Sequence, residues 1–79
     1  MSTVLRGSGF RVVIYANDHN PAHVHVFGSG EAKVNLMGTD GRPQLIWAFG
    51  MKVAEVRKAM HLVDDHQVLL LEAWDRIHG

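Results

Sequence analysis

Residues 23–35 of the chain, HVHVFGSGEAKVN, decide its fold. Two runs that alternate polar and apolar side chains flank a glycine-rich turn at residues 28–30, the pattern of a β-hairpin with one buried face. A three-residue turn with glycine at its last position is a common hairpin connection. A two-residue turn would mix the two faces, which is costly when one face is buried. The three-residue turn predicts four cross-strand pairs: Val24 with Val34, Val26 with Ala32, His25 with Lys33, and His23 with Asn35.

Further β-rich runs lie on both sides of this hairpin, at residues 10–15 and 45–49, and residues 3–6 could add a leading strand. After Gly50 the apolar spacing becomes helical. Asp64 and Asp65 favour a break in this helical segment, because Asp prefers helix N-caps to helix interiors. Apart from Gln67, one stripe of the segment is apolar: Val53, Val56, Met60, Val63, Leu70, Trp74 and Ile77.

These patterns predict an α+β fold for a single domain, residues 1–79. A small antiparallel β-meander of four to five strands would be packed on one face by the C-terminal helical segment, as one kinked helix or two short helices. Trp47 and Trp74 are both expected to be core anchors, because large aromatic side chains dominate the packing of small cores.

Composition excludes several classes of protein. The chain has no cysteine, so neither a disulfide framework nor a thiolate site can form. Eight basic residues balance eight acidic ones, which argues against a generic nucleic-acid binder. Near-zero net charge favours association, including a homodimer. The N-terminus does not read as a signal peptide and no apolar run is long enough to span a membrane, so we expect a cytoplasmic protein without a membrane contact.

The predicted register places His23, His25, Lys33 and Asn35 on one polar face of the sheet. If Phe10, Val12 and Ile14 point into the core, then Arg11 and Tyr15 join this face. Three interpretations of the face follow.

The first interpretation is a small ribonuclease that needs no metal or other cofactor. His23 and His25 would be the catalytic acid and base, because histidine exchanges protons near neutral pH. Arg11 and Lys33 would hold the phosphate of RNA, and Tyr15 and Asn35 would complete the binding surface.

The other interpretations need no acid–base catalysis. Imidazoles at i and i+2 of a strand could share one metal ion with His19 or Asp18, but only two ligands are well placed by the pattern and zinc usually takes three or four. The face could instead be an ordinary solvated surface or an interface with a partner protein, since aromatic side chains and Arg are enriched at interfaces.

Four segments together resemble the small bacterial family known as domain of unknown function 4160. The resemblance spans nearly the whole chain, and residues 38–50 match least well. The segments are Thr3-Val4-Leu5-Arg6 followed by Gly9-Phe10, Pro21-Ala22-His23-Val24-His25-Val26, Glu31-Ala32-Lys33, and Leu69-Leu70-Leu71-Glu72-Ala73-Trp74.

This resemblance implies a component of a toxin–antitoxin-like module, paired with a small partner protein encoded nearby. His23 and His25 are the positions of the family motif. The resemblance supplies no catalytic assignment, so the choice between ribonuclease, protein-binding or regulatory module, and metal-binding domain stays open at this stage.

Overall fold

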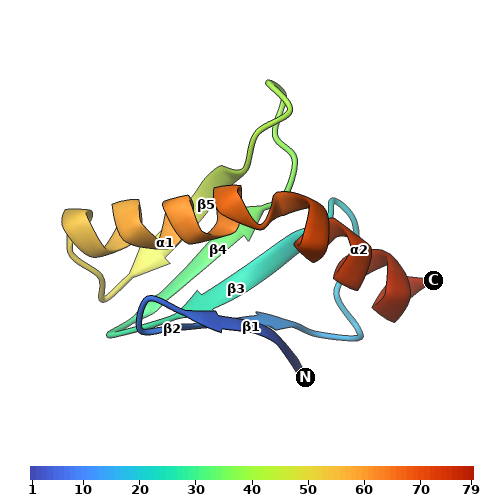
Figure 1. Cartoon of the computed structure of the whole chain (residues 1–79), viewed down its shortest axis with the longest axis horizontal. Helices are drawn as coiled ribbons and strands as arrows, with labels where there is room; N and C mark the ends of the chain where they lie inside the picture. Colours follow the sequence, from blue (N-terminus) through green and yellow to red (C-terminus); the bar gives the residue numbers. More distant parts are fainter.

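Five antiparallel strands follow one another across a single sheet, and two helices complete the chain (Figure 1). The computed structural model describes residues 1–79. The strands are β1 (Ser2–Gly7), β2 (Phe10–Ile14), β3 (His23–Phe27), β4 (Glu31–Asn35) and β5 (Gln44–Phe49). The predicted α+β meander is therefore confirmed, with all five strands present.

The β3–β4 hairpin has the predicted register. His23 pairs with Asn35, His25 with Lys33, and the two apolar pairs fall between them. Val24, Val26, Ala32 and Val34 are fully buried. Alternation of apolar and polar residues across a three-residue turn was therefore enough to predict both the pairing and the faces of this hairpin.

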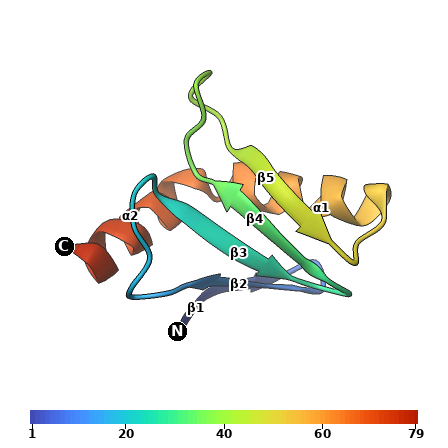
Figure 2. The same ribbon diagram turned by 180° about the vertical axis from the view of Figure 1, so that it is seen from behind.

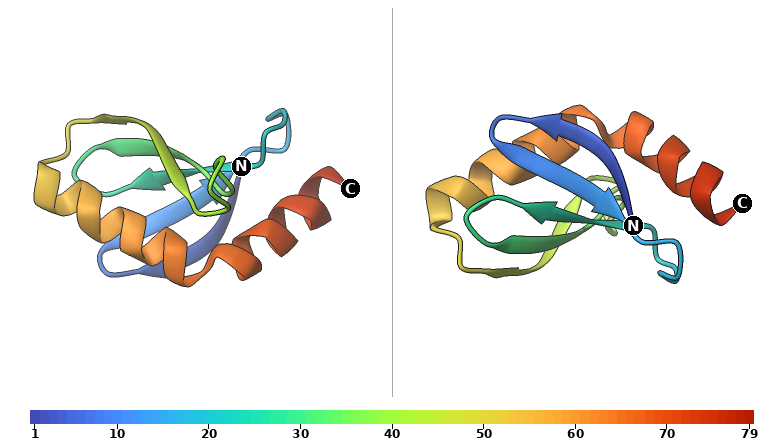
Figure 3. Two further views of the ribbon diagram at one scale, coloured as in Figure 1. Left: turned by 90° about the horizontal axis from the view of Figure 1, so that it is seen from above. Right: turned by 90° about the horizontal axis from the view of Figure 1, so that it is seen from below.

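Both helices lie on the same side of the sheet, and the opposite face carries no helix (Figures 1 and 2). They are α1 (Val53–Asp65) and α2 (Gln67–His78). His66 separates them with φ −118° and ψ 22°, so the expected break near Asp64 is confirmed and produces two helices. Viewed along the sheet, α2 extends past the strand ends toward the β2–β3 loop (Figure 3). Neither helix has the length and hydrophobicity needed to cross a membrane.

The core lies between the helices and β2, β3 and β4. The helices contribute Ala59, Leu62, Val63, Leu70, Ala73 and Trp74. Gln67, which interrupts the apolar stripe, donates hydrogen bonds through its amide to the carbonyls of Leu36 (2.7 Å) and Gly41 (2.9 Å). This side chain therefore ties the start of α2 to the β4–β5 loop, which explains a polar residue at an inward position.

Two sequence-based expectations about packing are wrong. Trp47 is not a core residue but is 41% exposed, because β5 is the last strand of the sheet and every residue of it is exposed. Val53, the first residue of α1, was expected on the apolar stripe but is 73% exposed. The inward face of α1 is instead formed by Ala59, Leu62 and Val63.

The hairpin turn is held by Glu55 of α1. The backbone N–H of Ser29 donates to Glu55 Oε2 at 2.7 Å, and the Ser29 hydroxyl donates to Oε1. These hydrogen bonds lower the pKa of Glu55 below its ordinary value of 4.5. A carboxyl whose pKa is lower in the folded protein adds stability above its ordinary pKa, and this stability is lost as the pH falls through the folded value.

We therefore expect the loss of unfolding free energy caused by Glu55→Gln to be larger at about pH 7 than at about pH 3, because the Glu55 carboxyl loses its charge, and with it this stability, as the pH falls through its lowered pKa. Urea unfolding of both proteins at the two pH values measures this difference. Equal destabilisation at both values would show that the charge of Glu55 does not stabilise the turn.

Candidate metal centre

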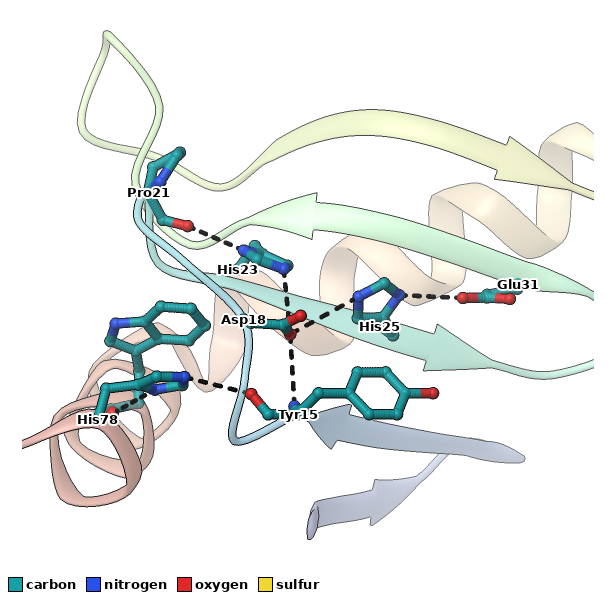
Figure 4. A network of polar contacts seen from close by, with 8 residues as sticks. Tyr15, Asp18, Pro21, His23, His25, Glu31 and His78 are labelled. Atoms are coloured by element: carbon teal, nitrogen blue, oxygen red, sulfur yellow. Dashed lines mark hydrogen bonds and ion pairs between the residues drawn. The ribbon is translucent and has the colours of Figure 1, made fainter. Parts of the chain in front are cut away.

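The β2–β3 loop folds back over the start of β3 and brings Asp18 against two histidines (Figure 4). The loop closes on itself because Asp18 N–H donates to the carbonyl of Tyr15 (3.1 Å) and Tyr15 N–H donates to Asp18 Oδ2 (3.4 Å). His23 and His25 lie two apart on β3, so their side chains project to the same face. This turn therefore positions a carboxylate opposite two imidazoles.

Three ligand atoms converge in this cluster. Asp18 Oδ2 lies 3.2 Å from His23 Nε2 and 3.9 Å from His25 Nε2. The candidate ligand atoms of the three residues all lie within 4.8 Å of one another. We call Asp18, His23 and His25 the triad.

The other nitrogen of each imidazole is also engaged. His23 Nδ1 lies 2.9 Å from the carbonyl oxygen of Pro21, and His25 Nδ1 lies 2.9 Å from Glu31 Oε2 (Figure 4). Carbonyl and carboxylate oxygens only accept hydrogen bonds, so each Nδ1 is the donor. In the neutral imidazoles, Nε2 then presents a lone pair toward Asp18. Such a group of acceptors requires a proton or a cation between its members.

Aromatic rings hold the two imidazoles in place. The ring centroids of Trp74 in α2 and His23 are 5.2 Å apart, and those of Tyr15 and His25 are 5.0 Å apart with the two rings nearly perpendicular. Trp74 in turn stacks on His78, whose Nε2 lies 3.2 Å from the carbonyl of Tyr15. The end of α2 thus supports both the β2–β3 loop and the first histidine of β3.

The triad is partly shielded from solvent. His23 is 5% exposed, and the side chains of His25 and Asp18 are 14% and 19% exposed. His23 is therefore not a residue of an ordinary solvated face, because burial of a polar ring requires the partners described above.

A pocket of about 540 Å³ opens beside the triad. Lys33, Asn35 and Ile46 line one side of it. The loop lines the other side with Asn17, His19, Asn20 and Pro21. Of the residues predicted for the site, four gather here (His23, His25, Lys33 and Asn35), and Tyr15 contacts His25.

Arg11 is not brought to the pocket. Its guanidinium lies 5.1 Å above the Phe27 ring, and Nη1 donates to Thr3 Oγ1 at 3.5 Å. Arg11 pairs with Phe27 across β2 and β3, two residues beyond His25. It shares the face of the histidines, as expected, but lies toward the other end of the strands.

Two residues have a larger part in the site than the sequence indicated. Asp18 and His19 were the two candidates for a third metal ligand. In the structure Asp18 lies against His23 and His25, whereas His19 is exposed and is not part of the cluster. Glu31 was not among the residues predicted for the site. The predicted register contained a signal for it, because Glu31 lies diagonal to His25 on the same face of paired strands.

Comparison with known proteins identifies one family. Residues 9–75 match the model of the family described as Domain of unknown function (DUF4160). No curated protein and no solved structure matches the chain.

Proposed function

Because this chain belongs to the family described as domain of unknown function (DUF4160), whose description assigns no activity, we propose a function from the triad itself: binding of one divalent transition-metal ion. The observation that carries this proposal is the convergence of two imidazole Nε2 atoms on one carboxylate oxygen. Two imidazoles and a carboxylate suit zinc, and the same donor set suits iron(II).

The distances support a shared ion. Zinc binds imidazole nitrogen and carboxylate oxygen at about 2.0–2.2 Å, and tetrahedral angles then place ligand atoms roughly 3.3–3.6 Å apart. The separations of 3.2 Å and 3.9 Å from Asp18 Oδ2 bracket this range. The candidate ligand atoms of all three residues lie within 4.8 Å of one another, so side-chain movements of about an ångström would bring them to the spacing of zinc ligands.

The outer contacts support the same assignment. A metal-binding histidine usually donates its other ring N–H to a carboxylate or a backbone carbonyl, which orients the ring. His25 has the first kind of acceptor in Glu31, and His23 has the second kind in Pro21. Both imidazoles are therefore already oriented with Nε2 toward the proposed ion.

Three protein ligands are typical of catalytic zinc sites, in which the remaining position holds water or substrate. A metal bound here would activate such a water for hydrolysis. Lys33 lines the adjoining pocket and would attract an anionic substrate. A phosphodiester of RNA is the first substrate to test, and a role in a toxin–antitoxin-like module remains part of this proposal.

The geometry gives less support to a metal-independent ribonuclease. His23 is 5% exposed, so its Nε2 has little access to a substrate. Arg11 contacts Phe27, which removes one of the two cations expected to bind phosphate. Added metal chelator distinguishes the two versions, because only the metal-dependent version predicts that chelation abolishes RNA cleavage by the pure protein.

Calorimetric titration of the metal-free protein with Zn²⁺ tests the proposal. We expect one ion to bind per chain and to raise the melting temperature, because a ligand specific for the folded state stabilises it by about 2.7 kcal/mol at 100-fold excess over Kd. Neither heat of binding nor a change in melting temperature with Zn²⁺, Ni²⁺, Co²⁺ or Fe²⁺ would contradict it.

Glu31 is expected to act as a positioning residue. Glu31→Gln keeps all three ligands but removes the carboxylate that accepts from His25 Nδ1, and loss of such a partner typically lowers metal affinity about 10–100-fold. The same titration measures this loss. Glu72→Gln, on an exposed position of α2, is the matched control and should bind as the wild type does; an equal loss in both variants would contradict the role of Glu31.

A further inference from the structure

Exposed apolar side chains concentrate at one edge of the molecule. Large hydrophobic residues of β5 are 39–80% exposed (Leu45, Ile46, Trp47 and Phe49), and Val53 at the start of α1 is 73% exposed. These five form most of the exposed large hydrophobic side chains of the chain. We call residues 44–53 the β5 edge.

This edge is open for strand pairing. β5 is the last strand in the sheet order, so one side of its backbone has no neighbouring strand. Natural edge strands usually avoid pairing by means of charged side chains, proline or bulges. Residues 44–49 contain neither a charge nor proline, and the bulge at the β4–β5 register shift is the sole such device. The opposite edge, β1, carries Arg6.

The β5 edge is apolar on both faces of the sheet. Trp47 pairs with Lys33 and therefore lies on the face of the histidines, where Ile46 also lines the pocket of the triad. On the helix side, a groove of about 470 Å³ separates β5 from α1. The groove is lined by Leu45, Met51, Val53, Val56, Arg57 and Met60.

An occupant that covers this surface needs three features together: a strand to pair with the open edge, apolar side chains on both of its faces, and a helix beside it for the groove. β5 and α1 of a second copy supply all three, since the strand and the helix are adjacent in the chain and in space (Figures 1 and 2). Apart from Arg57, the side chains that line the groove are apolar, and zero net charge of the chain favours its association with a second copy.

We propose that two copies of the chain pair through their β5 edges, antiparallel and across a two-fold axis. The two sheets become one continuous sheet, and the two α1 helices pack side by side over the joint. A two-fold interface joins the same surface of both copies. Ile46 and Trp47 of each copy then lie at the joint, so the interface forms one wall of each triad pocket. This proposal does not depend on the metal.

Sedimentation equilibrium tests the proposal by measuring the mass of the metal-free protein in solution. The protein concentration should span roughly 1–100 µM, the range in which dimers of moderate affinity are populated. We expect a species of twice the 8.8 kDa chain mass. Phe49→Lys on one face and Val53→Lys on the other are each expected to weaken the dimer roughly 30-fold or more, because interface hot spots lose this much on disruption. Both positions are highly exposed in the single chain, so the fold should persist by circular dichroism.

Val68→Lys is the matched control. Val68 is 71% exposed on α2, outside the β5 edge, and this variant should remain dimeric. A monomeric wild type at about 100 µM, where even weak specific dimers form, would overturn the proposal and leave the β5 edge to a different protein. A dimer that survives both Phe49→Lys and Val53→Lys, or that Val68→Lys disrupts equally, would place the interface elsewhere and also overturn it.

Discussion

His25→Ala is expected to abolish the stabilisation of the protein by Zn²⁺. The substitution leaves two of the three proposed ligands, Asp18 and His23, and two ligands rarely suffice to hold zinc in proteins. The affinity for Zn²⁺ should fall by more than roughly 100-fold, which is the largest loss typical when only the hydrogen-bond partner of a metal ligand is removed. The melting temperature with and without Zn²⁺ measures this effect, because metal-induced stabilisation follows directly from the affinity for the folded state.

His19→Ala is the control for this experiment. His19 lies on the same loop and lines the same pocket, but it is exposed and is not a member of the triad. The variant should keep the full rise in melting temperature. If His19→Ala lost the stabilisation and His25→Ala kept it, zinc would bind to the loop and not to the triad.

Trp74→Ala is expected to have the largest effect on stability. Trp74 is 5% exposed and packs against both His23 and His78. Replacing a buried Trp by Ala usually costs about 3–5 kcal/mol. Domains have only about 0.05–0.15 kcal/mol of stability per residue, or roughly 4–12 kcal/mol for 79 residues, so this loss removes at least about a quarter of the free energy of unfolding. Urea unfolding followed by circular dichroism measures it.

Val68→Ala is the comparison within the same helix. Val68 is 71% exposed, and surface substitutions usually change stability by less than about 0.5 kcal/mol. If the two variants unfolded at similar urea concentrations, α2 would not anchor the core through Trp74, and the support of His23 by this helix would have to be rejected.

The sequence predicted the hairpin and the polar face well because both depend on local rules. Side chains alternate between faces along a strand, and the three-residue turn sets the pairing. From these rules alone, His23, His25, Lys33 and Asn35 were expected on one face, and the structure places all four around one pocket. Strand pairing also determines the position of Glu31, although its contact with His25 was not recognised.

The role of Asp18 could not be predicted to the same degree. A loop residue has no fixed register, and the hydrogen bonds between Asp18 and Tyr15 decide where its carboxylate points. Trp47 was assigned wrongly to the core for a related reason. A Trp side chain is equally hydrophobic in an edge strand and in a central strand, so its residue type does not distinguish the two positions. Only the strand order and the β4–β5 register shift reveal that Trp47 is exposed.

The most direct test of a metal at the triad is NMR of the imidazole nitrogens. The chain contains six histidines. We expect an equimolar amount of Zn²⁺ to shift the Nε2 resonances of His23 and His25 to metal-bound values, while their Nδ1 atoms stay protonated and the resonances of the other four histidines remain unchanged. Unchanged Nε2 resonances of His23 and His25 in the presence of Zn²⁺ would contradict this expectation.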